Sequence, residues 1–207
     1  MKNEIRKIIQ RHGLPFNGNI PTVGVGIERT SSAIRGRAMV LNILYTFSYY
    51  PAKLSFFQNY IERNDLTSFL TPVETAIIDS GKWTNQDLID LSWSKESLYV
   101  LLWALGLLDM KWPIKECDAD SIYNLMPPVV GEDIYNSNEV AITNHDLAVQ
   151  LNIHMYVHWA VRHPEEWSII NRLRYAKYNT SLVRARRLSL EWLANRRLNW
   201  EQISLDT

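Results

Sequence analysis

The stretch "WSKESLYVLLWALGLL", residues 93–108, decides the fold of this chain. From Leu98 to Leu105 it is apolar on nearly every face that a helix would present. A helix that is apolar all round belongs either in a membrane or in the interior of a protein. The apolar run from Leu98 to Leu108 is only about half of the roughly 20 residues that span a bilayer. We therefore predict a buried central helix over residues 92–108 and no membrane association.

The rest of the chain carries clear helix start and stop signals. Three segments place a threonine three residues before an acid, which is the pattern of a capping box: "TPVE" (71–74), "TNQD" (84–87) and "TNHD" (143–146). Gly13 and Gly81 follow apolar residues at helical spacing, a position at which glycine ends helices. These signals predict an all-α fold, a single globular domain of about eight to ten helices around the central helix.

The first 28 residues differ from the rest of the chain. A short amphipathic helix on Ile5, Ile8 and Ile9 leads into residues 14–30, which are rich in Gly and Pro and predict at most one short strand over Val23–Ile27. We divide the chain into an N-terminal helix with an irregular arm, 1–28, and a helical domain, 29–207.

Composition places the protein among ordinary globular chains. Apolar residues make up 46%, and 22 basic residues balance 22 acidic ones. A net charge of zero disfavours nucleic acid or an anionic membrane as a partner. Cys117 is the single cysteine, and the N-terminus lacks the apolar core of a signal peptide, so a cytoplasmic location is expected. No phosphate-binding loop or Gly-x-Ser-x-Gly motif is present, and we predict no cofactor.

The balanced total hides an asymmetry. Residues 85–140 hold ten acids against three lysines, whereas residues 162–197 hold nine bases, eight of them arginine, against three acids. One interpretation is that the two segments pack together and neutralise each other. A second is an exposed arginine face for RNA or an acidic partner, because arginine binds carboxylates and phosphates in a bidentate manner. A third is plain solvated surface.

Glu96 is the most informative polar residue of the opening stretch. On a helix it shares one side with Trp93, Val100 and Ala104. A buried carboxylate is costly unless it is paired and hydrogen-bonded. We therefore expect an arginine partner, with four candidates: Arg35, Arg37, Arg186 and Arg187.

His154 and His158 lie four residues apart and could face one metal ion. A third ligand is missing from the pattern, so we predict no metal site and expect one buried histidine and one at the surface. Asp118 and Asp120 could bind a cation or exchange protons, but Asp120 more simply caps a short helix near 119–126.

Several blocks together resemble a family catalogued as domain of unknown function 4272. They are "RTSSAIRGRAMVL" (29–41), "LTPVE" (70–74), residues 93–108, "WPIKECD" (112–118), "HDLAVQLNIHMYVHWAVR" (145–162), "RARRLSLEWL" (184–193) and "NWEQISLDT" (199–207). The resemblance covers about residues 29–207. It implies a mostly helical, mostly bacterial domain without an established activity.

The resemblance also singles out residues for a ligand site or a structural polar network. They are Arg29, Arg37, Glu96, Trp103, Asp118, Asp146, His158, Trp159, Arg186, Trp192, Trp200 and Asp206. The chain departs from the family pattern at Ala185, where the family tends to place an acid before the arginine.

The sequence supports two hypotheses about function. The first is a non-enzymatic protein-interaction module that binds another protein, of which the immunity proteins of toxin systems are one example. The second is an enzyme or small-ligand-binding protein, with Glu96, Asp118, His158 and Arg186 converging in one polar pocket.

Overall fold

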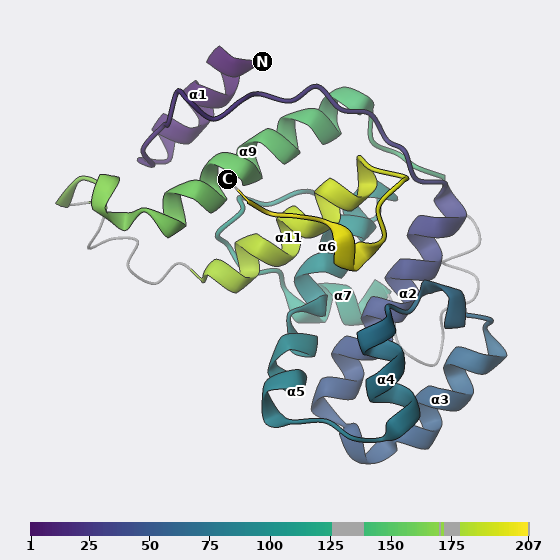
Figure 1. The fold of residues 1–207 in the computed structure, drawn as a ribbon. Coiled ribbons are helices and arrows are strands. Elements are labelled where there is room, and N and C mark those ends of the chain that lie inside the picture. The colour runs from purple at the N-terminus through teal and green to yellow at the C-terminus, as the bar shows by residue number, and fades with distance from the viewer. Residues whose placement is uncertain (126–138, 170, 172–178, 207) are drawn as a thin grey trace.

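The computed structural model describes residues 1–125, 139–169, 171 and 179–206 (Figure 1). Within these ranges the chain forms α-helices and short 3-10 turns and no β-strand, so the predicted single all-α domain is confirmed. The helices are α1 (Lys2–Arg11), α2 (Ser31–Tyr49), α3 (Leu54–Arg63), α4 (Pro72–Ser80), α5 (Asn85–Ser92), α6 (Ser94–Ala104), α7 (Ala119–Leu125), α9 (Asn144–Arg162) and α11 (Thr180–Leu193). The 3-10 turns are Pro51–Lys53, Thr67–Phe69, Pro164–Glu166 and Trp200–Gln202.

The predicted capping boxes set the starts of three helices. Thr71, Thr84 and Thr143 each accept a hydrogen bond from the backbone N–H three residues on, and the acid there accepts one in return. Gly81 ends α4 in the left-handed conformation, as expected. The cap of α7 was predicted wrongly, because Asp118 and not Asp120 accepts the hydrogen bonds from the first turn.

Helix α6 is the central helix, and it is shorter than predicted. Every residue from Glu96 to Ala104 is buried, and α2 and α11 pack against it (Figure 1). The helix ends at Ala104 because Gly106 is left-handed (φ +73°) and the N–H of Leu107 donates back to the carbonyl of Leu102. A Cβ at Gly106 would lie 2.6 Å from Ala141, so glycine is required there on two counts.

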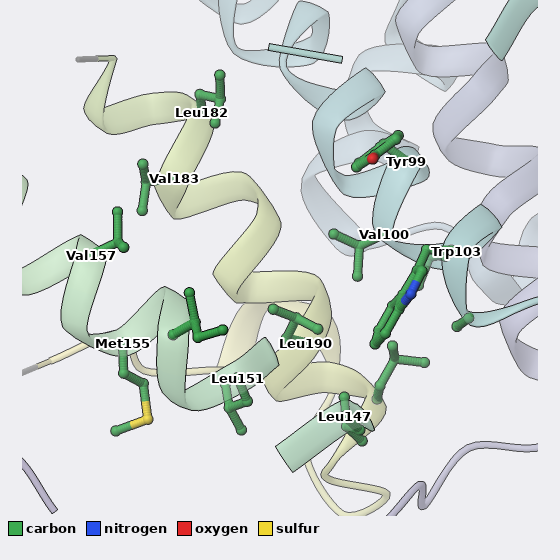
Figure 2. Close-up of a cluster of buried hydrophobic side chains, with 14 of the residues drawn as sticks. Tyr99, Val100, Trp103, Leu147, Leu151, Met155, Val157, Leu182, Val183 and Leu190 are labelled. Carbon is green, nitrogen blue, oxygen red and sulfur yellow. The ribbon is translucent and has the colours of Figure 1, made fainter. Parts of the chain in front are cut away.

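The core has two parts that share α2. The larger one joins α1, α6, α9 and α11, and Figure 2 shows side chains of α6, α9 and α11 meeting in it. The smaller one joins α2 to α3, α4 and α5 and includes Phe47, Phe57 and Leu91. In the part of the chain that the structure describes, none of the helices combines the length and apolar character needed to cross a bilayer.

The N-terminal arm is irregular but firmly attached to α9, and the strand expected over Val23–Ile27 does not form. Asparagine side chains of α9 replace a neighbouring strand as hydrogen-bond partners. Asn152 pairs with both the N–H and the carbonyl of Val23, and Asn144 accepts from Ile27. This is why the arm runs alongside α9 in Figure 1 without pairing with another strand.

Candidate functional site

Glu96 and Arg186 form a closed ion pair between α6 and α11. Both side chains are 0% exposed, and the Nε and Nη2 of Arg186 lie 2.7 Å from one carboxylate oxygen. The other oxygen accepts the backbone N–H of Cys117 at 3.0 Å. Arg186 also donates to the carbonyl of Lys115 and lies over the Tyr99 ring. The partner expected for Glu96 is therefore present, and the two groups have little capacity left for a ligand.

Arg37 belongs to a second buried pair that the sequence did not indicate. Its guanidinium binds both oxygens of Glu74, at 2.7 and 2.8 Å, and donates to the carbonyl of Phe69. Glu74 also completes the capping box of α4 through the N–H of Thr71. One carboxylate thus ties α2 to the start of α4, and Arg37 serves the fold in this structure.

Two adjacent tryptophans lie between two arginines beside this pair. Arg29 lies 4.3 Å from the centre of the Trp192 ring, Arg37 lies 4.2 Å from that of Trp200, and the two tryptophans are 5.4 Å apart. Arg29 also donates to the carbonyls of Trp192, Asn195 and Leu198. The layer lines a cavity of about 490 Å³, but its charged groups already bind the protein itself.

The four residues of the hypothetical pocket do not share one cavity. Asp118 is a surface cap of α7, and the hydroxyl of Ser121, followed by the backbone N–H of Asp120, lowers its pKa. Burial, with the charge of Glu96 in second place, raises the pKa of the Cys117 thiol, so that thiol is a poor nucleophile. His158 lies against Arg187.

The remaining residues singled out in the sequence also have structural contacts. Asp146 caps α9, and the Thr143 hydroxyl lowers its pKa. Trp103 is 9% exposed and lines a cavity of about 540 Å³ together with Asp146. Trp159 stacks on the ring of His163, 4.9 Å away.

Both histidines of the "HMYVH" segment are buried, so the prediction of one at the surface was wrong. The Nδ1 of His154 bonds to the carbonyl of Gln150, and burial lowers the pKa of His154 to about 3. Among the described residues, no group of three or more His, Cys, Asp or Glu side chains is placed to hold a metal ion.

His158 borders a cavity of about 440 Å³ at the C-terminal end of α9. It is 4% exposed, and its Nδ1 lies 2.8 Å from the Nη1 of Arg187. A guanidinium can only donate, so Nδ1 accepts and the ring proton is on Nε2. Burial, followed by the charges of Arg187, Arg162 and Arg184, lowers the pKa of His158 to about 4. The neutral ring thus keeps an Nε2–H donor, which has no partner among the described residues.

Two exposed arginines complete this cavity. Arg162 lies one turn after His158 on α9, and Arg184 lies one turn after Thr180 at the start of α11. Neither arginine makes an ion pair with any described residue. The remaining wall is the C-terminal segment: Ile203, Ser204, Leu205 and Asp206. We call these eight residues the arginine pocket.

The arginine pocket is where the charge asymmetry of the sequence reaches the surface. Between described residues of the acidic segment 85–140 and the basic segment 162–197, the structure shows one ion pair, Glu96–Arg186. Lys95 pairs with Glu116, and Arg187 with Glu191, each within its own segment. Mutual neutralisation therefore does not extend to Arg162 and Arg184 in the described part of the molecule.

Comparison with known proteins gives one match. The family model described as "Domain of unknown function (DUF4272)" matches residues 1–203. The chain belongs to the DUF4272 family. No curated protein and no solved structure matches it.

The DUF4272 match begins at residue 1, and so it includes the arm that the sequence resemblance left outside. The packing agrees with a family match that includes the N-terminal arm, because Ile5 and Ile9 of α1 are fully buried in the same core as α6. The resemblance singled out His158 and Asp206 of the arginine pocket but neither Arg162 nor Arg184. The available signal was the four-residue spacing of His158 to Arg162 and of Thr180 to Arg184, which places each pair on one helix face.

Proposed function

We propose that this DUF4272 protein is a non-enzymatic interaction module that binds an acidic protein partner through the arginine pocket. The observation that carries the proposal is the pair of exposed guanidiniums of Arg162 and Arg184, which have no acidic partner among the described residues. Arginine is enriched in the well-packed centres of protein interfaces and binds carboxylates in a bidentate manner. A partner that presents carboxylates would supply the missing counter-charges.

The buried polar groups support a binding role over a catalytic one. Glu96, Arg186, Arg37 and Glu74 are the strongest candidates for chemistry by burial, yet each is paired within the fold. A catalytic acid or base must reach the proton that it moves, and these groups reach only each other and the backbone. We place the protein in the cytoplasm, a location that its single, buried cysteine supports.

The test is affinity capture with the tagged full-length chain from cells that express it naturally, followed by mass spectrometry. The variant R162E/R184E reverses the charge of the pocket, and R196E/R197E reverses two other exposed arginines as a matched control. We expect a protein that the wild type and the control retain and that the pocket variant captures at least tenfold less. Equal capture by all three chains, or capture of nucleic acid in place of a protein, would contradict the proposal.

A further inference from the structure

We infer that the arginine pocket holds the phosphate group of a phosphate monoester between the Nε2–H of His158 and the guanidiniums of Arg162 and Arg184. The inference deepens the proposed function, on which it rests, by naming the anionic group that enters the pocket. The monoester could be a phosphorylated side chain of the partner or a free small molecule. The phosphate chemistry is the same in both cases.

The donors in the pocket are too many for one carboxylate. A carboxylate carries one negative charge, which a single bidentate guanidinium matches. The pocket offers two guanidiniums, the hydroxyl of Thr180 and an imidazole N–H. A phosphate monoester carries nearly two negative charges at neutral pH and three acceptor oxygens, which matches two arginines and an additional donor.

The start of α11 favours an anion in the pocket, whereas the C-terminal end of α9, which also borders it, carries partial negative charge. Thr180 is the first residue of α11, a helix of 14 residues, and the N-terminal end of a helix carries partial positive charge, although the side chain of Asn179 already accepts the N–H of Ser181 there. His158 lines the cavity, and its Nδ1 is already bonded to Arg187, so its Nε2–H remains available to an acceptor in the cavity. An oxyanion in the cavity would accept this N–H.

The C-terminal wall sets limits on the ligand. Among the described residues, Asp206 is the one carboxylate that lines the pocket, and it accepts a hydrogen bond from the Ser204 hydroxyl. The described side chains Arg162, Arg184 and Asp206 together carry a net charge of plus one, so Asp206 opposes an anion without cancelling the attraction. The volume of about 440 Å³ exceeds that of a phosphate ion, and Ile203 and Leu205 give the organic part of the monoester an apolar wall.

The direct test uses inorganic phosphate as the probe. The isotope-labelled full-length chain is titrated with phosphate at pH 7 and constant ionic strength, and the NMR signals of the His158 ring and the Thr180 amide are followed. We expect a saturable shift of both signals in the wild type and in the control R196Q/R197Q. We expect at least tenfold weaker binding in R162Q/R184Q and at least threefold tighter binding in D206N, because that change removes the opposing charge.

Three results would overturn the inference: the same shifts in sodium chloride alone, equal affinity of R162Q/R184Q and the wild type, or weaker binding by D206N. If the phosphate titration fails but R162E/R184E still loses its protein partner in the affinity capture, the proposed function remains supported and only the phosphate inference is wrong. Treatment of the captured partner with a phosphatase separates the two sources. Loss of capture assigns the phosphate to the partner, whereas unchanged capture together with phosphate binding by the free chain assigns it to a small molecule.

Discussion

Arg184 and Arg186 are two residues apart on α11, and their surroundings are opposite. Arg186 is 0% exposed, and Glu96, the carbonyl of Lys115 and the Tyr99 ring surround its guanidinium. Arg184 is exposed, has no ion-pair partner among the described residues and lines the arginine pocket. A step of two residues turns a helix by about 200°, so one side chain enters the core and the other reaches solvent.

In this chain, residue type alone does not distinguish an arginine that stabilises the fold from one that is available to bind a ligand. What separates them is whether the charge is satisfied inside the protein. A buried guanidinium without a carboxylate would destabilise the fold, whereas an exposed one is hydrated until a ligand binds. Removing a charge should therefore lower stability on the Arg186 side of α11 and lower binding on the Arg184 side.

The largest effect is expected for E96Q. Glutamine keeps the shape and an acceptor for the N–H of Cys117, but it leaves the charge of Arg186 buried without compensation. We expect a loss of about 3–5 kcal/mol in the free energy of unfolding, measured by urea denaturation.

E116Q is the matched control for E96Q. Glu116 also pairs with a base, Lys95, but its side chain is 57% exposed, so removing its charge should cost less than about 1 kcal/mol. Equal stability of E96Q and the wild type would show that the pair does not hold α6 and α11 together.

A smaller loss is expected for E74Q. Glutamine at residue 74 can still accept the N–H of Thr71 in the capping box, so the change removes mainly the charge that faces Arg37. The Glu74 side chain is 11% exposed, and water can replace part of the lost interaction. We expect a loss of about 2–3 kcal/mol by urea denaturation. If E74Q lowered the free energy of unfolding more than E96Q does, the prediction that the more deeply buried pair contributes more stability would be wrong.

The sequence predicted the fold well because the fold depends on local signals. Each of these signals spans only a few consecutive residues. They are the capping boxes at Thr71, Thr84 and Thr143 and the apolar run in 93–108. A buried Glu96 needs a cationic partner, and the sequence offers four arginines for that role. Which of them pairs with Glu96 depends on how the helices pack, and in the structure it is Arg186. The pair of Arg37 with Glu74 was missed because its members are 37 residues apart and only the approach of α4 to α2 brings them together.

The arginine pocket was harder to predict. Its residues come from α9, from the start of α11 and from residues 203–206, and the basic composition of 162–197 does not tell which arginines stay unpaired. The end of α6, by contrast, has a local signal. Gly106 gives a stop signal inside the apolar run, and the high hydrophobicity of the run obscured it.

An intermediate effect is expected from pH. The pKa values of His154 and His158 are lowered from 6.5 to about 3 and about 4, so between pH 4 and 6.5 the unfolded chain binds more protons than the folded one. Stability is therefore fully present above about pH 6.5 and falls as the pH decreases. The loss is at most about 1.4 kcal/mol per histidine for each pH unit.

The pH effect is measured by urea denaturation at pH 6.5 and pH 5.5, where carboxylates are still largely ionised. His12 contributes in the same direction but is exposed, so the buried pair should dominate. Replacing His158 with glutamine, which does not titrate, should remove about half of the pH dependence. A stability that rises on acidification would mean that these rings are protonated in the folded protein.

The smallest change in stability is expected for R162Q/R184Q, and here a null result is informative. Both arginines are exposed and unpaired among the described residues, so the free energy of unfolding should stay within about 0.5 kcal/mol of the wild type. A small gain is the expected direction, because Arg162, Arg184 and Arg187 repel one another around His158. The repulsion should weaken with added salt, so the gain should be largest at low ionic strength. A loss of about 1 kcal/mol or more would place these arginines with Arg186 among the groups that hold the fold, and the difference between the two sides of α11 would disappear.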